Sequence, residues 1–145
     1  MPQQNKPLVG RTKHGEFTLD QIADMQPGLG MLMPQISDRY WIMYYAAQGG
    51  NWGLAAYQLH EMTGLLKLGA TTRPKWSKYI NAFIKGHISA MQAAINEEDF
   101  SAFDIAYRSG INAANVYHVE TGHAEIIWEL PPDPPKHLSM RPKTS

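Results

Sequence analysis

The chain has 145 residues, of which 43% are hydrophobic, and its 13 basic and 13 acidic residues give a formal net charge of zero. This length fits one domain with a single core, and the balanced charge, without a Lys/Arg-rich block, argues against nucleic acid or an anionic membrane as a partner. The chain has no cysteine, which excludes disulfides, thiolate metal ligands, cysteine nucleophiles and thioether-bound haem.

Residues 1–27 are predicted to form a polar tail and a short lead-in helix. Thr18 and Gln21 have the spacing of a capping box, which marks the start of a helix. The tail has no apolar run of the ~7–15 residues that a signal peptide needs. The whole sequence has no segment near the ~20 apolar residues of a membrane span. We therefore expect a cytoplasmic protein that does not enter a membrane.

The first two predicted helices are joined by a very short break. Apolar residues recur at spacings of three and four over about 28–48, which predicts the first helix. Gly49 and Gly50 accept left-handed conformations and should end it. Asn51 can then cap a second helix over about 52–68. A connection this short predicts that the two helices pack antiparallel.

Two further helices are predicted, one after a proline and one after an acidic run. Pro74 suits the first turn of a third helix, where its missing N–H costs nothing. Acidic residues at 97–99 favour the N-terminus of a fourth helix, which Gly122 should end. The apolar stripe of the third helix is expected at Trp76, Ile80, Phe83, His87, Ala90 and Ala94.

These patterns predict an all-α protein in which residues 28–122 form an antiparallel up-down-up-down four-helix bundle. Residues 123–145 differ in character, because four prolines between Pro131 and Pro135 exclude a helix. We expect this segment to lie extended across the bundle and then to fray. Bundles of this architecture commonly pair through their first two helices, so we also expect a homodimer.

Three stretches of the sequence carry one family resemblance. They are the helix joint AAQGGNWGLAAYQLHEM at 46–62, the last-helix stretch FDIAYRSGINAANVYH at 103–118 and the closing segment HAEIIWELP at 123–131. Over about residues 27–131 the chain resembles the small bacterial monohaem c-type cytochromes, whose fold is a cytochrome c-prime-like four-helix bundle. The resemblance implies the same fold for this chain.

The chain departs from that family at the residues that hold the haem. The family's attachment frame is Cys-x-x-Cys-His, and here Ala114 and Tyr117 stand at the two cysteine positions while His118 is retained. In the first helix, Arg39 is followed by Tyr40 where the family has a histidine. We therefore expect a haem-less relative that does not perform the family's electron transfer.

The candidate site residues are aromatic, with one histidine and two arginines. Buried phenols on facing helices need hydrogen-bond partners and so favour a polar-lined pocket, although ordinary aromatic packing explains them equally well. Each arginine either extends to solvent or reaches the pocket and binds a carboxylate. We assign proton transfer to His118, Tyr40, Tyr44 and Tyr117, and substrate binding to Arg39, Trp41, Tyr107 and Arg108.

These residue types predict a site for a small planar aromatic compound such as a phenolic acid. We expect no cofactor and no metal site, so the chemistry must depend on acid–base groups, among which histidine exchanges protons most readily near neutral pH. We predict a cofactor-independent lyase or decarboxylase. A structural role for His118 and a pure binding function stay open, and the alternative is a protein that binds haem b non-covalently, with His118 as axial ligand.

Overall fold

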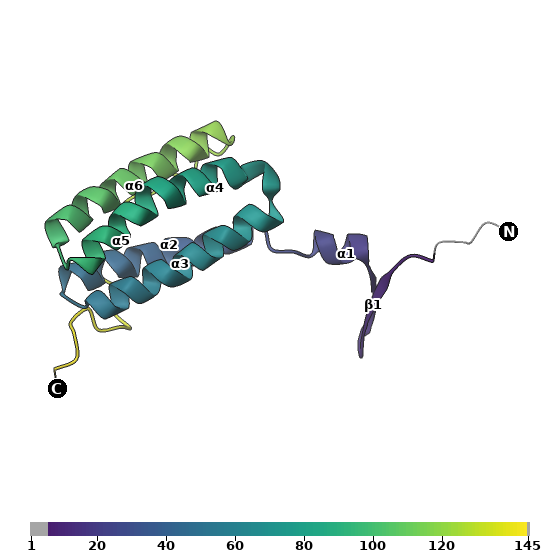
Figure 1. Cartoon of the computed structure of the whole chain (residues 1–145), viewed down its shortest axis with the longest axis horizontal. Coiled ribbons are helices and arrows are strands. Elements are labelled where there is room, and N and C mark those ends of the chain that lie inside the picture. The colour runs from purple at the N-terminus through teal and green to yellow at the C-terminus, as the bar shows by residue number, and fades with distance from the viewer. Residues whose placement is uncertain (1–5, 145) are drawn as a thin grey trace.

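The computed structural model of the chain describes residues 6–144. Residues 1–5 of the expected tail and Ser145 lie outside that range. The described part is mostly helical and carries one small sheet (Figure 1). Its elements are β1 (Val9–Thr12), β2 (Gly15–Thr18), α1 (Leu19–Asp24), α2 (Leu29–Gln48), α3 (Trp52–Thr72), η1 (Pro74–Trp76), α4 (Ser77–Phe83), η2 (Ile84–Ile88), α5 (Ser89–Asn96) and α6 (Phe100–Glu120).

The helices from α2 onward lie side by side as a bundle (Figure 1). α2 packs along α3, and α5 packs along α6, while α4, η2 and α5 follow one another without a break. The helical character predicted from the sequence is confirmed. The largest fully buried side chains come from all of these long segments and form one core: Ile36, Met43, Leu59, Met62, Met91, Phe103 and Tyr107.

Capping residues determine where the helices after two of the breaks begin. The carboxamide of Asn51 accepts a hydrogen bond from the backbone N–H of Leu54 at 3.1 Å, and α3 begins at the next residue. Asp99 caps α6 in the same way, by accepting from the N–H of Ala102 at 3.0 Å. α3 continues to Thr72, beyond the expected end near residue 68, because nothing breaks the helix before Pro74.

A π-turn at η2 shifts the buried stripe of the third long helical segment. The expected regular period placed His87 and Ala90 on the apolar face, but Ile88 and Met91 are buried instead. That part of the prediction is wrong, because a π-turn adds one residue to a turn and rotates everything after it. The turn leaves Phe83 and Ile88, five residues apart, on the buried side.

An N-terminal hairpin, which the sequence analysis did not predict, makes the all-α expectation wrong for residues 9–18. β1 and β2 pair antiparallel, with Val9 opposite Thr18, and Gly15 takes a φ of 145° after the turn. The expected capping box is present: Thr18 and Gln21 exchange hydrogen bonds of 2.9 and 3.1 Å at the start of α1. The hairpin and α1 project from the bundle as an arm (Figure 1).

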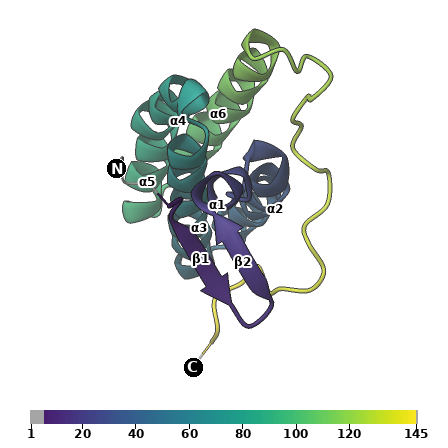
Figure 2. The same cartoon turned by 90° about the vertical axis from the view of Figure 1, so that its right-hand side faces the viewer.

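Residues 123–144, here called the C-terminal strap, run extended along the outside of the bundle past α2 (Figure 2). The side chain of Asn115 donates to the carbonyl of Trp128 at 3.0 Å and accepts from its N–H at 2.6 Å. Near the far end, Asn51 donates to the carbonyl of Ser139 at 3.1 Å. The strap therefore lies across the bundle as expected, and it is held well beyond the prolines where fraying was expected.

Tyr40 on α2 and Tyr107 on α6 join the two helices through the core. Their rings stack with centroids 4.0 Å apart and planes 13° apart. Each hydroxyl donates to the other residue's backbone carbonyl, at 2.5 Å from Tyr40 and 2.9 Å from Tyr107. Gly110 makes room for this pair, since a Cβ there would lie 2.5 Å from the Tyr40 hydroxyl oxygen.

Gly110→Ala should lower the free energy of unfolding by about 2–3 kcal/mol, because the added methyl group must displace a buried, hydrogen-bonded ring. Gly64→Ala is the matched control, since a Cβ at this exposed position of α3 meets no atom within 4 Å. The control should raise stability by up to about 1 kcal/mol. Urea denaturation measures both values, and similar effects for the two variants would contradict the tight contact at Gly110.

Candidate functional site

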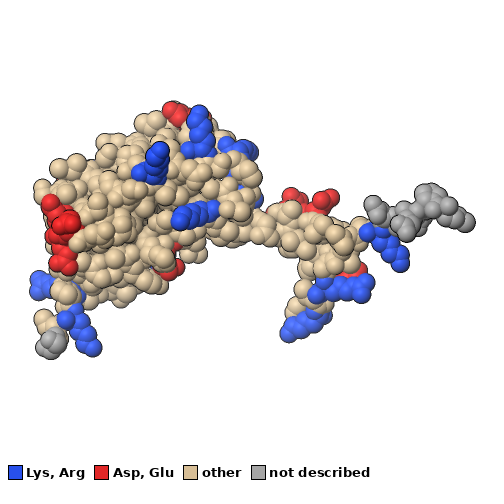
Figure 3. Space-filling model, in the orientation of Figure 1, with Lys and Arg blue, Asp and Glu red and all other residues tan. Residues whose placement is uncertain are grey.

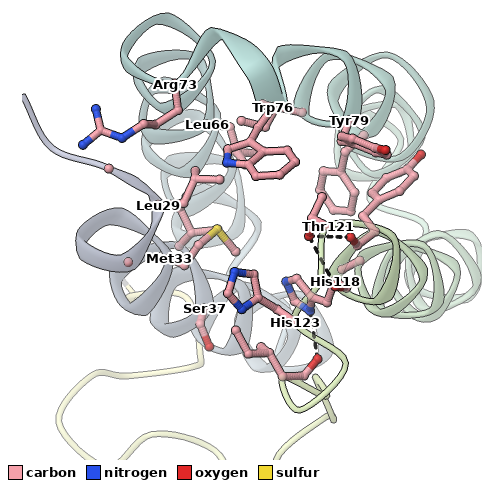
Figure 4. Close-up of a pocket in the computed structure, with 18 of the residues that line it drawn as sticks. Leu29, Met33, Ser37, Leu66, Arg73, Trp76, Tyr79, His118, Thr121 and His123 are labelled. Carbon is pink, nitrogen blue, oxygen red and sulfur yellow. Dashed lines mark hydrogen bonds between the residues drawn. The ribbon is translucent and has the colours of Figure 1, made fainter.

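A cavity of about 730 Å³ lies at the end of the bundle where α2 begins and α3 and α6 end (Figure 4). We call it the main cavity. Much of its wall is aromatic, and the rings come from the turn after α3, from α4, from α6 and from the strap. These rings belong to Trp76, Tyr79, Phe83, Tyr117 and Trp128. A cavity of this size with flat aromatic walls suits a planar ligand.

The charged side chains and the histidines on this wall are all basic. Arg73, Lys75, His118 and His123 line the main cavity, and the described residues that line it include no Asp or Glu. The Nζ of Lys75 lies 4.8 Å from the centroid of the Trp76 ring. Arg73 instead turns away from the cavity (Figure 4), and its guanidinium donates to the Gln26 carbonyl at 3.0 Å. The wall therefore favours an anion.

The imidazole of His118 is oriented by one hydrogen bond. Its Nδ1 lies 3.0 Å from the backbone carbonyl oxygen of Ile126 in the strap. Because a carbonyl oxygen only accepts, Nδ1 must carry the hydrogen, and Nε2 then carries the lone pair of the neutral ring. The ring lies edge-on to Trp128, with centroids 6.0 Å apart. His118 thus presents a proton-accepting nitrogen at the main cavity.

A second cavity of about 480 Å³ lies between α2 and the strap. Trp128 contributes to the walls of both cavities. Three of the residues expected at the site, Tyr40, Trp41 and Tyr107, line this second cavity and not the main one. The indole N–H of Trp41 donates to the Asp133 carbonyl of the strap at 2.8 Å. These side chains therefore fasten the strap and the core.

The remaining expected residues take part in contacts between helices. The hydroxyl of Tyr44 donates to Asp104 at 2.9 Å, and Arg108 pairs with the same carboxylate oxygen at 2.9 Å. Burial, followed by the bond to Asp104, raises the pKa of Tyr44 above the ordinary tyrosine value. Arg39 donates to the buried Gln58 on α3 at 2.9 Å. Neither cavity wall includes Tyr44, Arg108 or Arg39.

The structure thus brings two of the expected site residues, Tyr117 and His118, to the main cavity. It adds three that the sequence analysis did not assign to a site: Lys75, Trp76 and Tyr79. Their signal in the sequence is the run PKWSKY at the start of the third helical segment, where two aromatic and two basic residues fall within six positions. A helix start next to a chain reversal places such side chains at the end of a bundle.

No protein-family model, curated protein sequence or solved structure matches this chain. Within residues 6–144, no helix is long and apolar enough to cross a membrane. The same range contains no group of three or more His, Cys, Asp or Glu side chains placed to hold a metal ion. The cavity is therefore the feature of this chain from which a function can be inferred.

The stacked tyrosines predict a specific response to alkali. Burial raises the pKa of both Tyr40 and Tyr107 far above the ordinary tyrosine value. The unfolded chain, in which tyrosine ionises near pH 10, then releases protons that the folded chain retains. The resulting stability is complete below about pH 10 and is lost above it, by about 1.4 kcal/mol per pH unit for each tyrosine.

Tyr40→Phe should reduce this alkaline slope by roughly one tyrosine's share. Ile36→Val, a change in the same core, should lower stability at every pH and leave the slope unchanged. Urea denaturation at several pH values between 8 and 11 measures the slope for each variant. Equal slopes in the wild type and in Tyr40→Phe would contradict the assigned role of the buried pair.

Proposed function

We propose that the main cavity binds a small planar aromatic compound that carries an acidic group, such as a phenolic acid. One observation carries this proposal: a cavity of about 730 Å³ has aromatic walls, and the charged side chains and histidines on those walls are basic. An aromatic ring stacks on such walls, and a carboxylate is stabilised by Lys75 at the rim. A cationic ligand would meet no carboxylate among the described lining residues.

The two ends of the cavity suggest how a phenolic acid would lie in it. The Nζ of Lys75 lies over the Trp76 ring, in the turn after α3, and His118 belongs to the last turn of α6. Trp76 and His118 lie on opposite sides of the cavity (Figure 4). A carboxylate near Lys75 would leave the rest of the ring to extend toward Tyr117 and His118. This orientation places the imidazole Nε2 beside the ring or its phenolic hydroxyl.

The reaction that these groups support is a cofactor-independent lyase reaction of the decarboxylase type. Loss of CO₂ breaks the bond between ring and carboxylate, and the electron pair stays on the ring carbon, where a proton must replace the CO₂. In the orientation above His118 lies at the hydroxyl end, so its Nε2 accepts the phenolic proton, and water supplies the proton that replaces CO₂ on the ring carbon. Tyr117 is the nearest phenol on the same helix. Tyr40 and Tyr44 have no proton-transfer role in this proposal, because their hydroxyls already donate within the fold.

The fold assigned to this site is an up-down-up-down bundle of the cytochrome c-prime type. The short breaks at Gly49–Asn51 and at Glu97–Asp99 support it, since each leaves no room for a crossover connection. The position of His118 supports it as well, because the retained histidine of the family's frame lies at a cavity in this chain too. A cytoplasmic location remains part of the same proposal.

Calorimetric titration with 4-hydroxybenzoate and with the neutral 4-hydroxybenzyl alcohol tests the binding proposal. We expect the acid to bind more tightly, and Lys75→Gln to weaken the acid about fivefold while leaving the alcohol unchanged, since a partly exposed ion pair contributes about 1 kcal/mol. Lys67→Gln, an exposed lysine of α3 outside the cavity wall, is the control. Equal binding of acid and alcohol would refute an anion-selective cavity.

Measurements of CO₂ release and of binding distinguish an enzyme from a binding protein. If the chain is a decarboxylase, 4-hydroxybenzoate or a related phenolic acid should release CO₂, and His118→Gln should abolish that release while it keeps most of the binding. If a phenolic acid binds and none of the phenolic acids tested releases CO₂, the protein is a carrier or sensor and the lyase assignment fails.

Non-covalent haem b is the second candidate, and the hydrogen bond from His118 Nδ1 to the Ile126 carbonyl favours it. Such a bond orients a ligating histidine and leaves Nε2 for the iron. The aromatic wall and the basic rim also fit a flat macrocycle with carboxylates, and His118 would hold the iron. Bound haem would supply one-electron chemistry.

Titration of the protein with haemin decides this candidate. A stoichiometric, sharpened Soret band that is lost in His118→Ala would establish haem b binding at His118. An unchanged haemin spectrum at micromolar protein would remove the candidate, and the phenolic acid proposal would stand alone.

A further inference from the structure

The outward face of α6 carries an uncharged row of exposed residues, here called the outer seam. Its members, at spacings of three, four, three, four and three, are Ala102, Ile105, Ser109, Asn112, Val116 and Val119. Ile105 is 69% exposed, Val116 52% and Val119 61%. A helix that faces only water normally carries charged or polar side chains on that face. The outer seam therefore marks a contact surface.

The spacing of the seam identifies the kind of partner. Alternation of three and four residues is the heptad pattern, which keeps a row of side chains facing a second helix along its whole length. α6 already buries its opposite face in the core, through Phe103, Tyr107, Gly110 and Ala114. The seam is thus additional to the bundle's own packing, and it is open to a helix of another chain.

The order of residues in the seam is complementary to itself. It reads apolar, apolar, polar, polar, apolar, apolar from Ala102 to Val119. When two copies of α6 lie antiparallel about the centre of the seam, Ser109 faces Asn112 of the other copy, and Ile105 faces Val116. Polar groups then meet polar groups and apolar groups meet apolar ones, which is the arrangement that a two-fold interface requires.

The acidic run before α6 bears on the orientation of the two copies. α6 begins directly after Glu97, Glu98 and Asp99. Parallel copies would bring six carboxylates together, whereas antiparallel copies separate the two acidic runs by the length of a 21-residue helix, about 30 Å. That distance is nearly four Debye lengths at physiological salt. Each acidic run then lies near the other copy's Glu120, His123 and Glu125, so each end collects five carboxylates and one imidazole in place of the six carboxylates of the parallel arrangement.

We propose that the outer seam is the interface at which two copies of this chain associate through antiparallel α6 helices. This inference does not depend on the ligand of the main cavity. It places the expected homodimer on α6 instead of on the first two helices, because the strap already runs past α2 and bonds to Trp41 (Figure 2). In Figure 3, Asp and Glu side chains gather at the left end of the bundle, and Lys and Arg side chains lie on the middle and right of the visible face.

The available area sets the strength of the dimer. A helix about 30 Å long and 10 Å wide covers roughly 300 Å² per copy, less than the ~800 Å² per partner of a typical stable interface. The α4–α5 segment packs against α6 and carries exposed small residues, Ala82, Ala90 and Ala93. The seam alone is smaller than a typical stable interface, so the dimer should be weak and reversible, with a dissociation constant in the upper micromolar range.

Sedimentation equilibrium over about 1 µM to 1 mM tests the interface. The wild-type chain should pass from monomer to dimer, and Val116→Glu should raise the dissociation constant at least about 30-fold, because it places a carboxylate opposite Ile105 of the other copy. Tyr57→Glu, at a 55% exposed position of α3, is the matched control and should change nothing. Circular dichroism confirms that each variant is folded.

A wild-type chain that stays monomeric to 1 mM would overturn the proposal. So would a dimer that Tyr57→Glu abolishes and Val116→Glu leaves intact, since it would place the contact on α3. Ala102→Cys tests the orientation in this cysteine-free chain. Spin labels at this site should lie about 26 Å apart in the antiparallel dimer, from 17 residues of helical rise, and about 10 Å apart in a parallel one. The shorter distance would refute the antiparallel arrangement.

Discussion

Two tyrosines that exchange hydrogen bonds with each other's backbone fix how α2 and α6 lie together. Tyr40 can stack on Tyr107 only where Gly110 leaves room for its ring. This requirement allows only one position of α6 along the axis of α2. Sliding α6 by one turn, about 5.4 Å, would remove both hydrogen bonds and leave two buried hydroxyl donors without acceptors. Each such loss costs about 1–3 kcal/mol. The positions of Tyr117 and His118, further along α6, follow from this placement of α6 against α2.

Asn115 gives the strap a comparably fixed position. Its carboxamide pairs with both backbone groups of Trp128, much as a neighbouring β-strand would. The indole of Trp128 is thereby held at the wall that separates the two cavities. His118, three residues after Asn115, binds the strap at Ile126. The last turns of α6 thus fasten the strap and shape the main cavity with the same few side chains.

The parts of the fold that were predicted correctly depend on local signals. Asn51 and Asp99 act within one turn of the chain, and their side chains cap the helices that follow them. The hairpin was missed because its strands have four residues each and its turn, with Gly15, resembles an ordinary loop. The π-turn was missed because nothing local distinguishes Ile84–Ile88 from a regular helix, and the core decides which residues are buried.

The candidate site was predicted in part, for a similar reason. His118 and Tyr117 reach the main cavity because the end of α6 is the end of the bundle. Tyr40, Tyr44 and Tyr107 have the residue type of pocket-lining phenols, yet their hydroxyls bond to carbonyl and carboxylate oxygens within the fold. Only the three-dimensional positions of those acceptors distinguish a structural tyrosine from a catalytic one. Lys75 and Trp76 enter the site through the chain reversal after α3, which brings distant residues together.

The extra residue in η2 lets one continuous helix face two different surroundings. Before it, Trp76, Tyr79 and Phe83 face the main cavity, and after it Ile88 and Met91 face the core. In a regular helix each residue turns the chain by about 100°, so without the extra residue one of these two sets would point elsewhere. The residues that line the cavity can therefore change while the apolar half keeps the bundle closed. In this sense the turn separates the residues that shape the cavity from those that keep the chain folded.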